Sequence, residues 1–173
     1  MVDYSPDEQN VITCEDFLWD REIHLLTTEA QIQASFPVVK QLRPELASEE
    51  YLPLVRQLNE ESGYQLVGLM DSSTYICVAG FRLCHSLGWG RYLYVDDLVT
   101  LESHRSSGAG KEVLTWLTEF GFKAGCRDLR LDSALYRHDA HRFYLRERMD
   151  IHCFHFKLPL EEKTLRTKGL LKD

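Results

Sequence analysis

The sequence predicts an α/β protein whose mixed sheet is covered by helices. Apolar residues alternate in some segments of the 173-residue chain, as in strands, and recur every three to four positions in others, as in helices. Strand candidates in the first half follow one another through short turns, which favours antiparallel pairing. In the second half helices separate them, as crossover connections require. The expected order is β-α-α-β-β-β-α-β-α-β.

The first strand candidate, residues 22–26, leads into two expected helices. Thr28 followed by Gln31 forms a capping-box pattern, which predicts a helix start. This helix should end before Pro44, because the residue preceding a proline avoids helical dihedral angles. The next helix should end at Gly63, since glycine is the usual residue beyond a helix C-terminus.

Three strands are expected in the middle of the chain. The first two are joined by an Asp-Ser-Ser turn, which is a hairpin signal, and the third is long. They cover residues 64–70, 74–84 and 91–101.

The remaining elements alternate between helix and strand. An amphipathic helix should follow the third of these strands and end at Gly125, because its apolar residues fall on one face. After it we expect a strand at 128–132, a helix at 138–149 and a final strand at 151–160.

One domain, residues 21–160, is expected between two polar ends. Residues 1–20 carry six acidic residues and no Lys or Arg, and are expected either to be disordered or to dock on the domain. Residues 161–173 form a polar tail that should fray.

Composition excludes some classes of function. The net charge of −7 argues against nucleic acid as a partner. No apolar run is long enough to span a membrane, so no membrane partner is expected. The five cysteines are odd in number and widely spaced, which favours free thiols in the cytoplasm. We also expect no metal, since His138 and His141 lack a third ligand nearby.

The stretch Arg105 to Gly110, RSSGAG, is typical of an anion site, because it links a strand to a helix through two glycines. Unpaired N–H groups at a helix start bind phosphate, and glycine lets a ligand approach the backbone. The nucleotide P-loop pattern fails because Glu112 follows Gly110-Lys111, and the dinucleotide pattern fails because its third glycine is Val113. A third pattern, [RQ]xxGx[GA], fits in full.

That pattern is the acyl-CoA pyrophosphate loop of the GNAT superfamily, which the chain resembles over roughly residues 22–158. YVDDLVTLESHRSSGAG resembles the family's fourth strand and loop, and AHRFYLRERM resembles its A-x-x-x-Y helix. The resemblance implies a GNAT-like acyl-CoA N-acyltransferase fold, with acetyl-CoA as cosubstrate and direct acetyl transfer to a primary amine of a small molecule or protein. The alternative is a non-catalytic acyl-CoA-binding module with a sensor or regulatory role.

The resemblance also implies which residues hold the cofactor. Backbone of the fourth strand would pair with the pantetheine arm, and the loop would surround the pyrophosphate. The helix expected at 138–149 adds Ala140, and Arg137 directly precedes it. Arg137 stands where the family often has asparagine. The expected set is Leu98, Val99, Thr100, Arg105, Ser106, Ser107, Gly108, Ala109, Gly110, Lys111, Arg137 and Ala140.

Three residues are candidates for catalysis. Tyr144 stands where many members of the family place a tyrosine beside the CoA sulfur, and a phenol can donate a proton to a departing thiolate. Asp96 and Asp97 lie inside an apolar strand and are candidates to bind the ammonium and accept its proton. Because side chains alternate along a strand, the two should face opposite ways. Asp97 is then expected to be buried and structural, bonded to backbone, and Asp96 to serve the site, unless a nearby bulge upsets this count. Alternatively, both are structural or lie at the strand edge.

Two departures from the family affect the expected architecture. The Gly-Phe pair that commonly ends the last helix is here Arg148-Met149. The closing hairpin is shortened to the single strand expected at 151–160. A seventh strand would come from a partner subunit, giving a homodimer, or the strand would be bent.

Overall fold

The computed structural model describes residues 21–171, so the acidic segment 1–20 lies outside the described residues. The described chain divides into two units, one ending at Leu131 and one beginning at Asp132. Each unit is described by itself.

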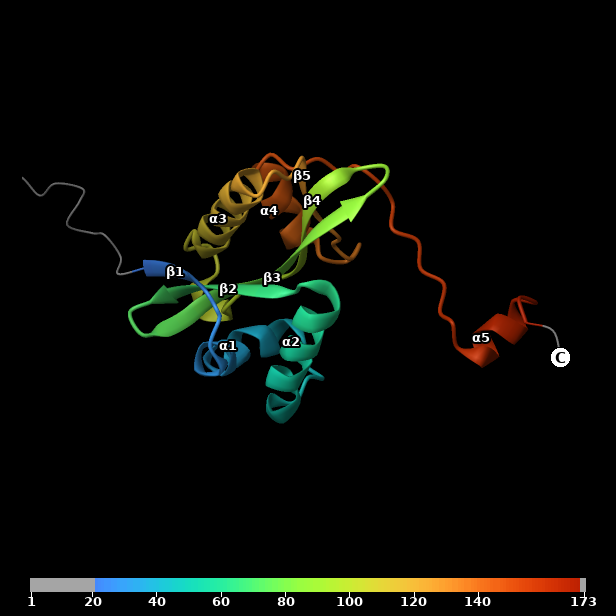
Figure 1. Ribbon diagram of the computed structural model, residues 1–173, viewed down its shortest axis with the longest axis horizontal. Helices are drawn as coiled ribbons and strands as arrows, with labels where there is room; N and C mark the ends of the chain where they lie inside the picture. The colour runs from blue at the N-terminus through green and yellow to red at the C-terminus, as the bar shows by residue number, and fades with distance from the viewer. Residues whose placement is uncertain (1–20, 172–173) are drawn as a thin grey trace, which may run out of the picture. The chain divides into compact units, whose positions relative to one another are not determined.

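The first unit is built on a five-stranded sheet whose spatial order equals the chain order (Figure 1). Neighbouring strands from β1 to β4 are antiparallel, whereas β5 is parallel to β4. This is the mixed sheet that the sequence predicts. The strands are β1 (Arg21–Leu25), β2 (Gln65–Asp71), β3 (Thr74–Ser86), β4 (Gly90–Thr100) and β5 (Asp128–Leu131).

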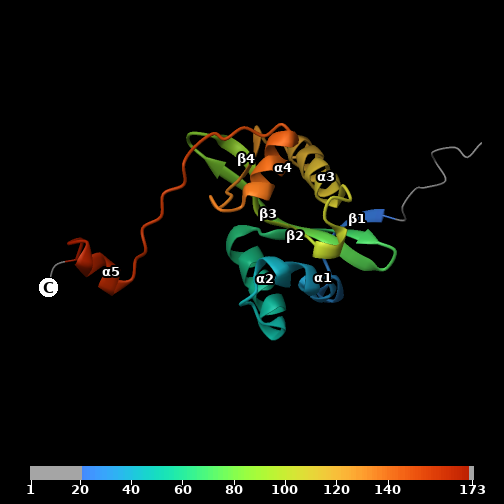
Figure 2. The ribbon, with the colours of Figure 1, turned by 180° about the vertical axis from the view of Figure 1, so that it is seen from behind.

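Three helices cover the two faces of the sheet, with α1 and α2 on one face and α3 on the other (Figures 1 and 2). Their bounds are α1 (Glu29–Leu42), α2 (Ser48–Ser62) and α3 (Ala109–Lys123). Alternation along the strands divides the core accordingly. Leu66 belongs to the apolar cluster with α1 and α2, and the adjacent Val67 to the cluster with α3.

The helix ends follow the local chemistry that the sequence shows. Thr28 accepts the N–H of Gln31 through its hydroxyl oxygen, while the Gln31 side chain accepts the N–H of Thr28, so the capping box is confirmed. Gly63 and Gly125 take the left-handed conformation, with φ of 68° and 74°, at the ends of α2 and α3. These caps fix where α1 begins and where α2 and α3 end.

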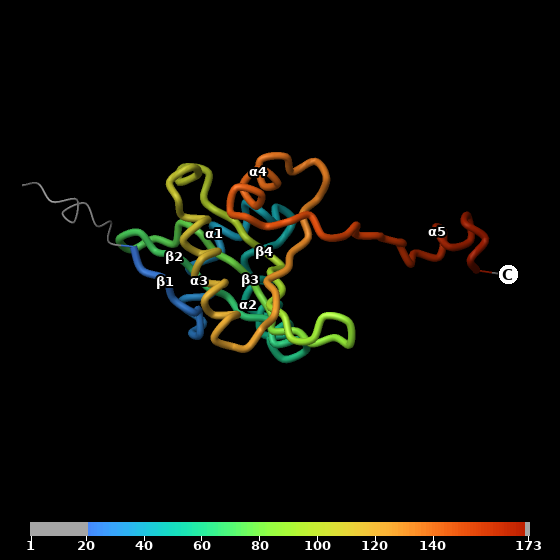
Figure 3. The backbone as a smooth tube through the Cα atoms, turned by 90° about the horizontal axis from the view of Figure 1, so that it is seen from above, coloured from blue at the N-terminus to red at the C-terminus, as the bar shows by residue number. Residues whose placement is uncertain are grey.

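The second unit contains α4 (His138–Arg146) and a short helix, α5 (Glu162–Thr167), and Figure 3 traces the backbone that joins them. Among the described residues, no strand lies between these two helices. The final strand expected at 151–160 is therefore not formed. An alternating apolar pattern predicts a strand face but supplies no hydrogen-bond partner, and Phe154 and Phe156 are exposed. Helix α5 lies in the polar tail, and Arg166 pairs there with Glu162 at i, i+4.

Within residues 21–171, no helix is long and apolar enough to cross a membrane. The four cysteines in this range are free thiols, and Cys77 is buried between the sheet and α3.

Candidate active site

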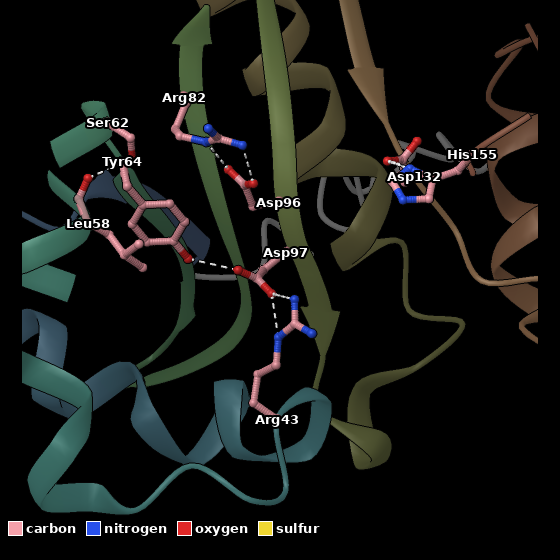
Figure 4. A network of polar contacts seen from close by, with 9 residues as sticks. All are labelled: Arg43, Leu58, Ser62, Tyr64, Arg82, Asp96, Asp97, Asp132 and His155. Carbon is pink, nitrogen blue, oxygen red and sulfur yellow. Dashed lines mark hydrogen bonds and ion pairs between the residues drawn. The ribbon is translucent and has the colours of Figure 1, made fainter. Parts of the chain in front are cut away.

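A pocket of about 830 Å³ opens between the α1–α2 end of the first unit and the strands β3 and β4. Its wall is largely apolar, but six charged residues also line it, and four of them form the two arginine–aspartate pairs drawn in Figure 4. The lining comprises Val39, Leu42, Arg43, Pro44, Glu45, Leu46, Glu50, Tyr51, Leu54, Val55, Leu58, Ser62, Tyr64, Arg82, Asp96 and Asp97.

A β-bulge brings two carboxylates to this pocket. Gly80 of β3 pairs with Asp97, but the next residue, Phe81, pairs with Val95, so Asp96 has no partner residue across the ladder. The expectation that Asp96 and Asp97 face opposite ways is thus wrong, because the extra residue in β4 interrupts the alternation of side chains. Both carboxylates line the same pocket.

Two side chains hold Asp97, whereas bonds to backbone were expected from the sequence. Arg43, at the end of α1, donates from Nε at 2.9 Å and from Nη2 at 2.5 Å to Oδ1 of Asp97. The Tyr64 hydroxyl donates to Oδ2 at 2.9 Å (Figure 4). The carboxylate is only 14% exposed, so these partners replace most of its hydration.

Tyr64 reaches Asp97 only because residue 80 is glycine. A Cβ atom at Gly80 would lie 1.8 Å from the Tyr64 hydroxyl oxygen. Burial and the nearby Asp97 charge raise the pKa of Tyr64 well above its usual value. The phenol therefore stays protonated and acts as a permanent hydrogen-bond donor to the carboxylate.

Asp96 forms a two-point ion pair with Arg82 of β3. Arg82 donates from Nε to Oδ2 at 2.8 Å and from Nη2 to Oδ1 at 2.7 Å. These hydrogen bonds raise the pKa of Arg82, so its guanidinium remains cationic. Parallel bonds of this kind fix the orientation of both groups.

One edge of β4 is open beyond the bulge. The ladder between β4 and β5 ends at the pair Val95–Leu131. Farther along, Leu98, Val99 and Thr100 pair only with β3 among the described strands. Their β5-facing backbone groups are therefore available to an extended ligand.

The glycine turn presents backbone amides at the start of α3. Gly108 is the N-cap with φ of 87°, and among the described residues no side chain caps this end. A second positive φ, at Ser106, curls the preceding turn. Arg21 donates to the Ser107 carbonyl and, at 2.7 Å, to the Glu112 carboxylate. This ion pair offsets the one acidic charge in the first turn, which favours anion binding there.

The other expected residues of the loop are exposed or packed. Arg105 and Lys111 point to the surface, Arg105 with Glu102 at 3.8 Å. Ala109 is buried and Gly110 half-buried. Backbone N–H groups are therefore the main donors that the loop offers to an anion, and the exposed side chains of Arg105 and Lys111 can add positive charge.

The helix-borne candidates belong to the second unit. Arg137 is the N-cap of α4, and Ala140 and Tyr144 are half-buried on that helix. The Tyr144 ring lies 5.3 Å from that of Phe143. The roles of these three residues stay predictions. Across the described residues, no three His, Cys, Asp or Glu side chains gather as a metal site requires.

Three residues of the site escape sequence reasoning: Arg43, Tyr64 and Arg82. Arg43 and Tyr64 are 54 and 33 residues from Asp97 in the sequence, and Arg82 is 14 residues from Asp96. The one local signal is Arg82 itself, a charged residue inside the apolar run VAGFRLC. A cation there requires a compensating acid, which β4 supplies.

Comparison with known proteins gives a consistent result. Residues 25–149 match the Acetyltransferase (GNAT) family. The chain is 35% identical over 124 residues to the uncharacterized N-acetyltransferase YhdJ of Bacillus subtilis, covering 70% of this chain and 87% of that protein. It is 37% identical over 67 residues to an aminoalkylphosphonate N-acetyltransferase of Salmonella typhimurium, covering 39% of this chain and 42% of the relative.

The fold also has solved counterparts. An aminoglycoside N-acetyltransferase, AAC(6')-Iy, crystallised in complex with CoA, superposes with a TM-score of 0.70 at 14% identity. The match covers 82% of this chain and 96% of that one.

Proposed function

The chain belongs to the GNAT acetyltransferase family and transfers acetyl groups from acetyl-CoA to an amine, and we propose that this amine binds in the pocket of Asp96 and Asp97. The observation that carries the proposal is the bulge in β4, which turns both carboxylates into one pocket. The pocket is contiguous along β4 with the open edge at Leu98 to Thr100. An amine in it would lie near a thioester placed along that edge.

Asp96 is the better acceptor for the ammonium group. Each of its oxygens accepts one hydrogen bond, from Arg82. On Asp97, Oδ1 already accepts two from Arg43 and Oδ2 accepts one from Tyr64. A carboxylate has about four lone-pair sites, so Asp96 retains more free capacity. Asp97 instead orients Arg43 and Tyr64 at the pocket wall.

Acetyl transfer requires a neutral amine, and the carboxylates provide the route for its proton. Asp96 would first hold the ammonium and then accept its proton, directly or through a water molecule in the pocket. The nitrogen lone pair could then attack the thioester carbonyl, which bound acetyl-CoA supplies. Holding amine and thioester side by side lowers the entropic part of the barrier.

The cofactor would be held by backbone. The amides from Ser106 to Lys111 would surround the diphosphate at the α3 N-terminus, and the open edge at Leu98, Val99 and Thr100 would pair with the pantetheine arm. Tyr144 would protonate the departing thiolate, for which a phenol is a suitable donor. Arg137 and Ala140 would contact the cofactor from the same helix.

A small primary amine is the acceptor class that we propose. A pocket of about 830 Å³ matches the usual size of small-molecule sites. The Salmonella relative is named for an amine of low molecular weight, an aminoalkylphosphonate.

The test follows CoA thiol release from acetyl-CoA over a panel of primary amines. Wild type should turn over at least one amine, and Asp96→Asn should lower kcat/KM at least about 100-fold, because the amide cannot hold an ammonium or accept its proton. Glu60→Gln is the matched control, since Glu60 is exposed on α2 outside the pocket.

Two results would contradict the proposal. One is an Asp96→Asn enzyme as active as wild type. The other is CoA binding by calorimetry without thiol release on any amine, which would fit the acyl-CoA-binding module instead.

A further inference from the structure

The interior of the pocket is not simply acidic. Its two aspartates are each paired with an arginine, Asp96 with Arg82 and Asp97 with Arg43. The two remaining acids of the lining, Glu45 and Glu50, are exposed at the rim. Charges at an exposed rim are screened by water and salt, whereas Asp96, Arg82 and Asp97 are screened less, because their side chains are 24%, 30% and 14% exposed. Arg43, which completes the second pair, is itself 54% exposed. The inner part thus offers equal positive and negative charge.

Arg82 keeps part of its hydrogen-bonding capacity for a ligand. Its bonds to Asp96 use Nε and Nη2. Within the described residues, Nη1 of Arg82 forms no hydrogen bond. The Arg82 side chain lines the pocket and is 30% exposed. The two bonds to Asp96 and the Tyr94 ring, 5.4 Å from the guanidinium, hold it in place. A preorganised guanidinium of this kind is suited to bind a carboxylate or phosphonate oxygen.

A purely cationic acceptor fits this arrangement poorly. Its ammonium would approach Asp96 beside the Arg82 guanidinium, and a second cation close to that ammonium would meet Arg82 or Arg43, since Glu45 and Glu50 lie at the rim. An acceptor that carries an anion next to its amine provides a partner for each of the paired groups. Electrostatic complementarity of this kind contributes more to specificity between ligands than to overall affinity.

We propose that the acceptor is a zwitterion, a primary amine joined by a short carbon chain to a carboxylate or phosphonate, with its amine on Asp96 and its anion on Nη1 of Arg82. The inference rests on the proposed function, since it assumes that the amine binds in this pocket. The carbon chain would lie against the apolar wall formed by Leu42, Leu54 and Leu58. Arg82 is then a specificity-determining residue rather than a catalytic one.

The first experiment compares acceptors of similar size on the wild-type enzyme. β-Alanine and aminoethylphosphonate carry the anion, β-alaninamide replaces it by a neutral amide, and diaminopropane replaces it by a second cation. Thiol release should give a kcat/KM at least about tenfold higher for the zwitterions than for the other two, mainly through KM. A preference for the amide or the diamine would overturn the proposal while leaving acetyl transfer in this pocket intact. Absence of turnover with every amine would overturn the proposed function as well.

The second experiment asks whether Arg82 sets the preference. Arg82→Gln should bring the ratio of zwitterion to amide close to one, and Arg82→Lys should retain part of it, since lysine keeps the charge but lacks the fork. Arg56→Gln is the matched control, because Arg56 is an exposed arginine of α2 that pairs with Glu29 outside the pocket. The ratio is the readout, so a general loss of activity does not imitate the effect. An unchanged ratio in folded Arg82→Gln, verified by circular dichroism, would overturn the proposal; if that variant does not fold, the ratio in Arg82→Lys and the wild-type acceptor series decide.

Discussion

Gly80 is the residue on which the position of the Tyr64 hydroxyl depends. A Cβ atom there would lie 1.8 Å from that oxygen, so the ring would have to move away from Asp97. Gly80→Ala should therefore destabilise the fold by about 1–3 kcal/mol through overpacking. It should also lower kcat/KM, because Asp97 loses a donor. Urea unfolding and thiol-release kinetics measure the two effects.

The control for this change is Gly88→Ala in the β3–β4 turn, where an added Cβ meets no atom within 4 Å. It should stay within about 0.5 kcal/mol of wild type. Equal unfolding midpoints for the two variants would show that Tyr64 is not held by close contact at residue 80.

Asp96 and Asp97 illustrate what sequence reasoning gives at the residue scale and what it does not. Two acids in an apolar strand must be compensated, which identifies them as candidates for a site. Their directions cannot be read from alternation, because the bulge depends on how β3 pairs with β4 across the turn. Their partners are likewise invisible, since Arg43 and Tyr64 come from other elements and meet Asp97 only after folding.

Helix α3 is the element on which cofactor binding is proposed to depend. Its first turn exposes backbone amides behind Gly108, and the Glu112 charge is already offset by Arg21. Gly110→Asp would place an uncompensated carboxylate among these amides, where it would repel a diphosphate. Binding of CoA, measured by calorimetry, should fall at least about 100-fold.

Gly88→Asp provides the comparison for that experiment, because it adds the same charge in a turn with open space. CoA affinity should be unchanged there. Normal CoA binding by Gly110→Asp would show that the diphosphate lies elsewhere.

Elements whose boundaries depend on local chemistry are the ones that the sequence predicts well. The capping box at Thr28 and the left-handed glycines at 63 and 125 act within a few residues of chain, and the structure has them where expected. The strand expected at 151–160 fails for the opposite reason. A strand is completed by a neighbour, and the sequence pattern carries no information on whether one is present.

At the scale of the whole molecule, buried tyrosine hydroxyls should make the fold less stable as the pH rises into the alkaline range. Burial raises the pKa of Tyr51 to about 12 from its ordinary value of 10.0. Between these values the unfolded chain releases a proton that the folded chain retains, so stability falls as pH rises from about 10 to about 12. The slope from one such group is at most about 1.4 kcal/mol per pH unit. Tyr64 acts in the same direction.

Tyr51→Phe should therefore flatten this decline. The free energy of unfolding, measured in urea between pH 10 and 12, should fall less steeply with pH in the variant than in wild type. Tyr136→Phe, at a tyrosine that is 75% exposed, should leave the wild-type slope unchanged. Parallel curves for Tyr51→Phe and wild type would contradict the assignment.

Two features of β4 separate its backbone from its side chains in the proposed site. The ladder with β5 ends at Val95, and the bulge follows directly after it. In the proposed arrangement the backbone at Leu98 to Thr100 would hold the acyl donor, whereas the side chains of Asp96 and Asp97 line the pocket beside the connection between α1 and α2. Because these two sets of residues do not overlap, a substitution in the connection is expected to change the preference for the amine while the affinity for CoA stays unchanged. On this proposal, acceptor preference can change through a few positions around Arg43 while the residues proposed to hold the acyl donor stay the same.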